Sequence, residues 1–457
     1  MKIISFFLAC LLSLFCFIPP AWAFCGFYVS KADATLYNQA SQVAIARDGD
    51  KTVVTMANDY QGEIKDFAIV VPVPTVLTKE QIRVAKPQII QRLDAFSAPR
   101  LVEYFDANPC EERVFWESRP QLATSPVAPT SSSRPSTQNL GVTVEARYNV
   151  GEYDILILSA KESDGLATWL HQNGYKMPRG ANTLLKPYIR QKMKFFVAKV
   201  NLEKFTTNGY EFLRPLQISY ESSQFMLPIR LGMMNANQAQ DLIVYILSPQ
   251  GQAEVTNYRT VKIPSNLNLP VYIKSEFKDF YKSMFQTVYT KEDRKVAFLE
   301  YAWDMGSCDP CSAEPLSPEE LKEAGVFWLN QPPVTTPGGN QNSFPSFPPN
   351  FNQNNVYISR LHVRYTRDKF PEDLIFQTTS NQENFQGRYI LQHPFTGKVT
   401  CAAGRRYKQT LRRRFEQEAQ TLAKLTNWSI NDIRKKMKID HQVSLSWWQR
   451  LLAWLFS

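Results

Sequence analysis

Two segments that are rich in proline and poor in charge divide the chain and limit which parts can form a continuous core. Residues 121–140 are dominated by Ser, Thr and Pro and carry one charge, and residues 331–355 hold six Pro, six Asn and no charged residue. Such segments bury too little apolar surface to offset the entropy lost on ordering. We therefore predict them as linkers.

The first 23 residues have the pattern of a secretory signal peptide. Lys2 precedes an apolar run from Ile3 to Ile18, and Ala21-Trp22-Ala23 has the small-x-small form of a cleavage site. An uncleaved membrane anchor is the alternative, but a run of about 16 residues is shorter than the roughly 20 that span a bilayer. We predict a cleaved leader, no transmembrane span in the mature chain, and a periplasmic or extracellular location.

The leader and the linkers together predict the domain organisation. Cleavage leaves 434 of the 457 residues, which is more than one ordinary domain. The predicted parts, in order, are a signal peptide (1–23), an N-terminal β-rich domain with a helical patch (24–120), a linker (121–140), a central α+β domain (141–330), a linker (331–355) and C-terminal strands with basic helices (356–457).

Hydrophobic periodicity predicts many strands and few helices. Residues 41–47 and 52–58 alternate as strands around an Asp-Gly turn signal. Helical spacing covers 86–105, interrupted by Pro99. The other predicted strands are 66–74, 141–150, 153–160, 193–200, 216–222, 225–232, 241–248, 295–303, 356–366 and 388–395, and the other predicted helices are 162–175, 274–289 and 405–425.

This mixture predicts an α+β fold, with a β-rich body of mixed or antiparallel sheets and a helical basic C-terminal segment. An apolar content of 44% is typical of a globular chain, and an aromatic content of 13% suits a β-rich fold.

Cysteines offer the first candidate site. Five remain after cleavage, and export makes each a disulfide candidate: Cys25, Cys110, Cys308, Cys311 and Cys401. Because five is odd, at least one thiol is free or pairs with another chain.

The pair Cys308 and Cys311 in "WDMGSCDPCSAEPLS" allows three interpretations: a structural bridge, a redox site and half of a zinc site. Asp309 opposes thiolate formation, and the prolines that follow prevent a long helix from starting at Cys308. No second CxxC or HxxxH pattern completes a zinc site. A bridge that fixes the turn at Pro310 is favoured, although the loop-entropy model gives it only ~2 kcal/mol, against ~6 kcal/mol for a bridge such as Cys25–Cys401.

Other catalytic signatures are missing from the sequence. It contains no G-x-S-x-G, H-E-x-x-H, P-loop, G-x-G-x-x-G or EF-hand pattern. The four histidines (His171, His362, His393 and His441) are far apart and are interpreted as structural or surface residues. We therefore predict no cofactor, no metal and no catalytic residue, although a hydrolase site assembled from distant residues stays open.

Charge is concentrated at the C-terminal end. From Cys401 to Ser457 there are 12 Lys and Arg but 4 Asp and Glu, so this segment carries a net +8 of the chain's +10. Such a tail suits an anionic membrane surface or an anionic envelope polymer. Export makes nucleic acid the least favoured partner.

The last residues, "SLSWWQRLLAWLFS", are rich in Trp and Leu behind this basic region. The segment is too short to span a bilayer. It could lie in a lipid interface through Trp447, Trp448, Leu451 and Trp454. Docking onto the protein body as a closing helix is the alternative.

Several motifs in order resemble one bacterial family. They are "FCGFYVSKADATLYNQASQVAIARDGDKTVVTMANDYQG", "DFAIVVPVPT", "YDILILSAKESDGLATWL", "LPIRLGMMNANQAQDLIVYIL", "WDMGSCDPC" and "HPFTGKVTCAAGRRYKQTLRRRFEQEAQTLAKLTNW". The chain resembles, over about residues 24–430, the exported family catalogued as domain of unknown function 2330. The resemblance implies a location outside the cytoplasm and a shared fold. It implies no activity and no catalytic residues.

These observations predict a non-enzymatic bacterial envelope protein that binds a partner or a surface through its basic tail. The alternative is a thiol-disulfide redox protein with Cys308 as the nucleophile and Cys311 as the resolving thiol.

Overall fold

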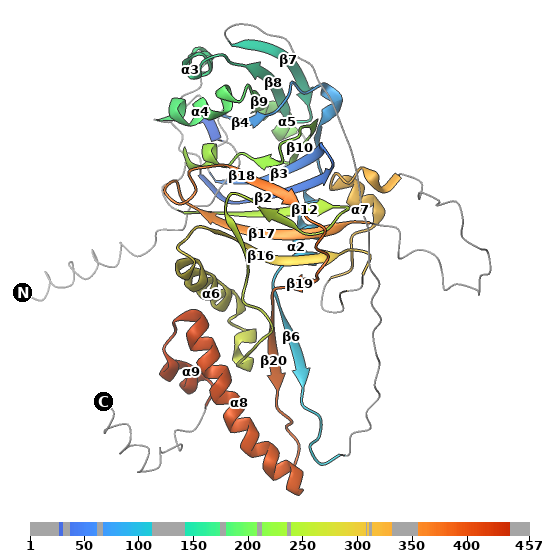
Figure 1. Cartoon of the computed structure of the whole chain (residues 1–457), viewed down its shortest axis with the longest axis vertical. Coiled ribbons are helices and arrows are strands. Elements are labelled where there is room, and N and C mark those ends of the chain that lie inside the picture. Colours follow the sequence, from blue (N-terminus) through green and yellow to red (C-terminus); the bar gives the residue numbers. More distant parts are fainter. Residues whose placement is uncertain are drawn as a thin grey trace, which may run out of the picture. The chain divides into compact units, whose positions relative to one another are not determined.

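The computed structural model describes residues 27–30, 37–61, 67–111, 142–173, 180–207, 213–234, 239–307, 309, 313–330 and 355–438. Within these ranges helices and strands are mixed along the chain, and the longest helix lies toward the C-terminal end (Figure 1). The predicted α+β class is confirmed.

The described residues form two compact units, each drawn from separate segments of the chain. The first unit holds the described residues within Met1–Ala98, Gln138–Lys262 and Glu292–Gln386. The second holds those within Pro99–Thr137, Ile263–Lys291 and Gly387–Ser457. The domain boundaries at the two linkers stay a prediction, because residues 121–140 and 331–354 lie outside the described ranges.

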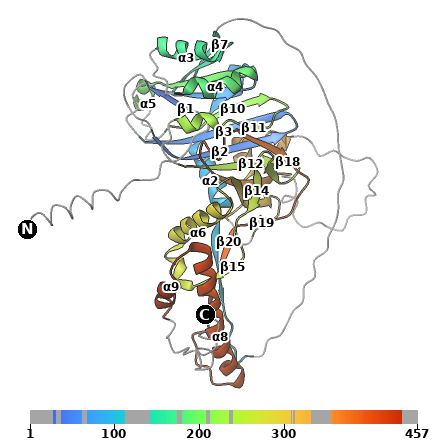
Figure 2. The ribbon, with the colours of Figure 1, turned by 60° about the vertical axis from the view of Figure 1, so that its left-hand side comes forward.

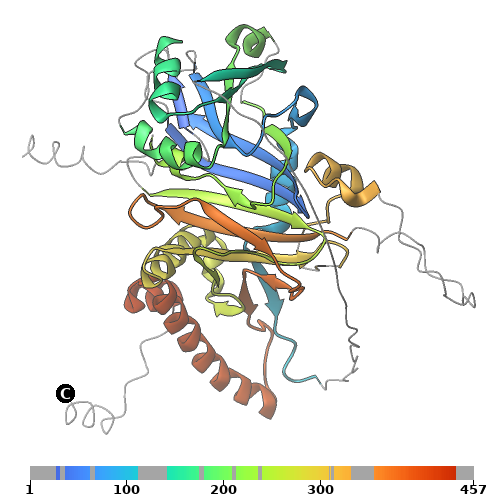
Figure 3. The ribbon, with the colours of Figure 1, turned by 45° about the horizontal axis from the view of Figure 1, so that its top comes forward.

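Two large sheets form the body of the first unit. The antiparallel five-stranded sheet has the order β1 (Phe27–Ser30), β4 (Phe67–Val73), β9 (Lys194–Val200), β8 (Tyr153–Ser159) and β7 (Thr143–Val150). The mixed nine-stranded sheet has the order β14 (Arg259–Lys262), β16 (Val296–Asp304), β17 (Tyr357–Tyr365), β12 (Gln240–Ser248), β2 (Tyr37–Asp48), β3 (Lys51–Gln61), β10 (Leu216–Glu221) and β5 (Ile82–Val84), with β19 (Phe385–Gln386) on β16. Figure 3 shows blue, light-green, orange and yellow strands of this sheet side by side.

Smaller elements complete this unit. A short antiparallel sheet joins β11 (Met226–Leu227), β18 (Leu374–Thr378) and β13 (Ala253–Val255). The helices are α2 (Pro87–Ser97), α3 (Ser163–Gln172), α4 (Ala181–Arg190), α5 (Leu202–Thr207) and α7 (Pro318–Glu323), with 3-10 turns η1 (Lys79–Gln81), η2 (Arg230–Met234) and η4 (Trp328–Asn330).

The period-two alternation of apolar side chains explains the layers. On β2, Val43 and Ile45 point into a core shared by both large sheets, while Ala44 points into a second core under α2 and α7. On β9, Phe195 faces a third core under α3 and α4. The first unit is therefore a helix–sheet–sheet–helix stack.

The second unit has a parallel sheet beside helices. Its strands, in order, are β15 (Leu267–Leu269), β20 (Arg388–His393) and β6 (Arg100–Phe105), and its helices are η3 (Val271–Lys274), α6 (Phe277–Lys291), α8 (Ala402–Thr426) and α9 (Ile430–Lys436) (Figure 2). The buried ring of Tyr389 on β20 lies 4.9 Å from that of Phe280 on α6, in an edge-to-face pair.

Most predicted elements are confirmed, with two corrections. The β2–β3 hairpin turns at Gly49, whose φ of 55° suits glycine. The helix predicted over 86–105 ends at Ser97, because Pro99 keeps Ala98 extended, and Arg100–Phe105 is the strand β6 paired with β20. The strand predicted over 225–232 is limited to β11, and η2 follows it after Pro228.

Candidate functional site

Several residues singled out in the sequence fall outside the described ranges. These are Cys25, Cys308, Cys311, His441, Trp447, Trp448, Leu451 and Trp454. Asp309, between the two cysteines of the CxxC motif, is described and buried. Its Oδ2 accepts hydrogen bonds from the hydroxyl of Tyr301 at 3.0 Å and from the amide of Gln386 at 2.8 Å. The bridge, redox and zinc interpretations of this motif stay predictions.

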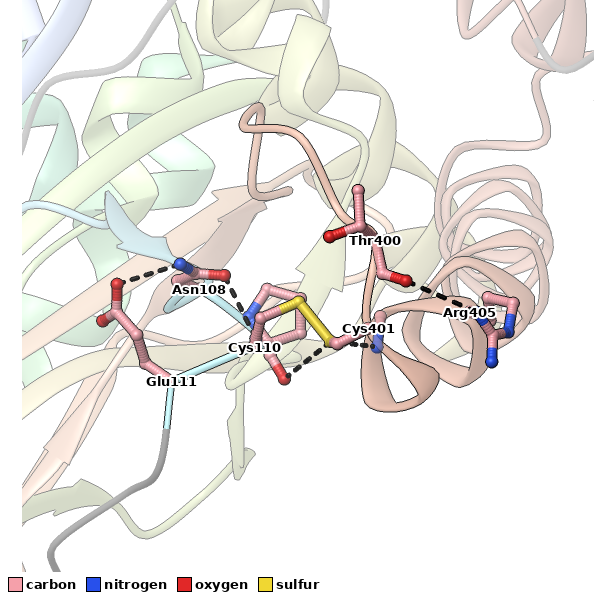
Figure 4. Close-up of a disulfide and its surroundings, with 8 residues drawn as sticks. Asn108, Cys110, Glu111, Thr400, Cys401 and Arg405 are labelled. Atoms are coloured by element: carbon pink, nitrogen blue, oxygen red, sulfur yellow. Dashed lines mark hydrogen bonds between the residues drawn. A yellow bond between two sulfur atoms is a disulfide. The ribbon is translucent and has the colours of Figure 1, made fainter.

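The other two cysteines form a disulfide in the second unit. Cys110 and Cys401 are joined although they are 291 residues apart in the sequence (Figure 4). Cys401 is also the N-cap of α8, and its Sγ accepts a hydrogen bond from the backbone N–H of Gly404 at 3.2 Å. The bridge therefore fixes the first turn of α8 to the segment that follows β6.

A second attachment lies one to three turns further along α8. Asp106, just after β6, accepts hydrogen bonds from the Tyr407 hydroxyl at 2.6 Å and from the Arg414 guanidinium at 2.8 Å. Burial raises the pKa of Asp106, but the hydrogen bonds from Tyr407 and Arg414 outweigh it, so the pKa lies below its usual value. Asp106 is therefore an ionised anchor for α8.

Glu418 continues this side of the helix one turn after Arg414. It is buried, and its Oε1 lies 3.5 Å from Nε of Arg414 without hydrogen-bond geometry. Burial raises the pKa of Glu418 to about 7, and the Arg414 charge opposes this only in part. The packed side of α8 thus holds a carboxyl group that titrates near neutral pH.

The far end of α8 is held within the same unit. Asn427 caps the helix with a φ of 58°, and the indole N–H of Trp428 donates a hydrogen bond to Ser283 of α6 at 3.1 Å. Glu416 accepts a hydrogen bond from Nε of Arg434 on α9 at 3.1 Å. Both ends of α8 are therefore fixed, so its outer side has a defined orientation.

The outer side of the first half of α8 is strongly basic. Five cations there are exposed, and we call them the basic face: Arg405, Arg406, Lys408, Arg412 and Arg413. Arg405, Lys408 and Arg412 are separated by three, four and seven residues, and Arg406 and Arg413 each follow one residue later, so the five lie within an arc of roughly 160° on one side of the helix. Tyr407, Leu411 and Arg414 occupy the opposite, packed side.

Nothing in the described residues neutralises this face. In this part of the chain none of the five cations pairs with a carboxylate, and their one side-chain hydrogen bond joins Arg405 to the carbonyl of Thr400 at 3.4 Å. The first acidic residue of α8 is Glu416, which pairs with Arg434. The arrangement suits a ligand that presents several negative charges in a row.

A separate charged cluster lies in the first unit, on the nine-stranded sheet. The ring of the buried His362 lies between two carboxylates, with Nδ1 2.7 Å from Glu300 and Nε2 3.2 Å from Asp241. Arg360 donates to Glu300 at 2.7 Å and to Asp94 of α2 at 2.7 Å.

Electrostatics make this cluster a structural ion network. Burial lowers the pKa of His362, but Glu300 and Asp241 outweigh burial and raise it to about 9. The ring is therefore a cation at neutral pH and not a metal ligand, which needs the neutral form. No grouping suited to a metal ion is found among the described residues.

Sequence reasoning located the basic segment but missed its anchors. Asp106 and Arg414 are 308 residues apart, and no local pattern connects them. One pattern in the sequence could have indicated the role of Arg414: it follows Tyr407 by seven residues, which places both on the packed side of the helix.

A comparison with known protein families identifies the family of this chain. A family model described as "Uncharacterized protein conserved in bacteria (DUF2330)" matches residues 19–377. The chain belongs to this family, as the sequence motifs predict. No curated protein and no solved structure matches the chain. Apart from β19, the large sheets of the first unit lie within the matched residues, and α8 follows them. None of the helices in the described part of the chain has the length and apolar content to cross a bilayer.

Proposed function

We propose that this protein is an exported, non-enzymatic envelope protein that binds an anionic surface through the basic face of α8. The observation that carries the proposal is the five exposed cations on one side of a helix that is fixed at both ends. Each Lys or Arg near an anionic membrane contributes on the order of 1 kcal/mol to binding. Five together supply a binding energy sufficient for reversible association.

The fixed position of α8 favours a binding role for the five cations over the alternative that they only contact water. A helix held by the disulfide and by Asp106 loses little conformational freedom on binding. The positive end of its helix dipole also lies at Cys401, at the same end as the basic face. Export and a location in the envelope rest on the leader and belong to this proposal.

The test uses the full mature chain and two anionic probes. Flotation with phosphatidylglycerol vesicles and co-sedimentation with an insoluble anionic polysaccharide distinguish a lipid surface from an envelope polymer. Binding to either probe that falls as salt rises supports the proposal, because salt screens exposed charges that are farther apart than the Debye length, which is about 8–10 Å at 0.1–0.15 M and shortens as salt rises. Equal recovery with neutral and anionic probes contradicts it.

Truncation before residue 440 separates α8 from the Trp-rich end. If α8 carries the binding, the truncated protein keeps its salt-sensitive binding to anionic vesicles. If only residues 440–457 bind, the truncation abolishes flotation, and the proposal for α8 is wrong.

A further inference from the structure

A hollow in the first unit has the features of a small-ligand site. It measures about 240 Å³, and its lining comes from β3, η1, β5 and β10 on one side and from α7 and the turn after it on the other. A neighbouring hollow of about 350 Å³ shares Lys51, Gln81 and Ser219 with it. Together they form a groove, which we call the β10 groove.

The wall formed by α7 is fixed against the sheet. Gly325 has a φ of 100°, and a Cβ there would lie 2.6 Å from the side chain of Val53 on β3. Gln217 donates to the carbonyl of Glu323 at 3.0 Å, and Arg83 donates to the carbonyls of Lys322 and Glu323 at 3.1 Å. The groove is therefore pre-formed, which reduces the entropy lost when a ligand binds.

Three cations surround the first hollow. Lys51, Arg83 and Lys322 are exposed, and in the described part of the chain none of them pairs with a carboxylate. Glu323 is paired with Lys86 at 2.5 Å, outside the lining. Glu80 is the acidic residue in the lining of the first hollow and Glu221 is that of the second, so three cations against two carboxylates leave the groove with an excess of positive charge.

The other lining groups suit an organic anion. The ammonium of Lys51 lies 4.5 Å from the ring centre of Phe327, which leaves an aromatic surface beside a cation. Val53, from the core under α7, adds apolar floor. The hydroxyl of Ser219, half-buried on β10, has no hydrogen-bond partner among the described residues and can donate to an oxyanion.

We infer that the β10 groove binds a small organic anion, with its carboxylate or phosphate group among Lys51, Arg83 and Lys322 and its apolar part against Phe327. Charge-assisted hydrogen bonds to such groups are about twice as strong as neutral ones. Pockets that bind small molecules combine apolar walls with a few placed polar groups, as this groove does. The inference is independent of the basic face of α8, which lies in the other unit.

Calorimetric titration of the full mature protein with inorganic phosphate and with benzoate tests this inference, with chloride at equal ionic strength as the reference. Saturable binding of either anion supports the inference and identifies the group as phosphate or carboxylate. No saturation by either anion above the chloride background overturns it.

A matched pair of double variants locates the binding. Lys51→Gln with Lys322→Gln removes two cations of the groove, and Lys186→Gln with Lys278→Gln removes two exposed cations elsewhere. We expect the first pair to weaken binding roughly tenfold or more, because two charge-assisted hydrogen bonds to the anion are lost. The control pair should bind as the wild type does. Equal affinity in both double variants overturns the inference.

Discussion

Cys110 and Cys401 are joined by a disulfide across 291 residues, so the start of α8 is covalently tied to the end of β6. The tie connects two segments of the second unit that are far apart in the sequence. It also holds the N-cap of the helix that bears the basic face. The bond therefore adds to the stability of this unit and, together with Asp106, helps to orient its cations.

Loss of this bond should destabilise the second unit. Cys110→Ser with Cys401→Ser should lower the free energy of unfolding by about 2–5 kcal/mol, because the closed loop is long. Urea unfolding followed by circular dichroism measures this. The wild type in excess dithiothreitol is the control and should match the double variant. Unchanged stability after verified reduction contradicts the expectation.

The network around His362 predicts a pH dependence of stability. Its pKa is about 9 in the folded protein and 6.5 in the reference state, so the protonated ring stabilises the folded form. This contribution is complete below pH 6.5 and is lost as pH rises through 9. The loss is up to about 3 kcal/mol, at about 1.4 kcal/mol for each pKa unit.

The free energy of unfolding, measured from about pH 6 to about pH 10, tests this pH dependence, because that range covers both the folded and the reference pKa of His362. In His362→Gln the part of this fall that the ring causes should disappear, because the titrating group is gone, and the fall near pH 7 that Glu418 causes should remain. The variant should also be less stable at pH 6.5, since Glu300 and Asp241 lose a cation between them. The same slope in both proteins contradicts the assignment.

The raised pKa of Glu418 predicts that replacing it with a neutral residue stabilises the protein at alkaline pH. Its folded pKa is raised from 4.5 to about 7, so the folded state holds a proton that the unfolded state releases, and stability falls as pH rises from 4.5 through 7. Glu418→Gln should therefore raise the free energy of unfolding at pH 8 by as much as about 3 kcal/mol and change it little at pH 4. Thermal unfolding at the two pH values measures this, and stabilisation at pH 4 alone contradicts it.

Alanine substitutions at two glycines with positive φ distinguish the cost of backbone strain from the cost of a steric clash. Gly325 and Gly180 have φ of 100° and 85°, but an added Cβ meets Val53 at 2.6 Å only at Gly325. Alanine costs about 1–3 kcal/mol at such a φ, and Gly325→Ala should cost more because Val53 must move. Chemical unfolding measures both variants. Equal losses would mean that the turn after α7 moves freely away from β3.

The sequence predicts elements well where the pattern is local. The alternation in 41–58, with its Asp-Gly turn, predicts β2 and β3, and the apolar positions of 405–425 predict α8. Arg100–Phe105 has helical spacing but forms a strand, because pairing with the distant β20 decides its structure. Short strands such as β13 and β15 were missed, since three residues carry no periodicity.

The candidate site was predictable only in part, for the same reason. Charge counting located the basic C-terminal segment. It could not separate Arg414, which binds Asp106, from Arg413, which is exposed, because the difference arises from packing against β6. The partner of Cys401 likewise required the structure, since five cysteines allow many pairings.

The most direct measurement of the central proposal compares two charge variants in vesicle flotation. One replaces Arg405, Arg406, Arg412 and Arg413 with Gln, and the matched control replaces Lys186, Lys278, Lys282 and Lys291 with Gln, so both lose the same charge. With phosphatidylglycerol vesicles, we expect the first to lose about 4 kcal/mol of binding energy, roughly a thousandfold in partitioning, and the control to lose far less. Equal losses in the two variants would contradict binding through the basic face of α8.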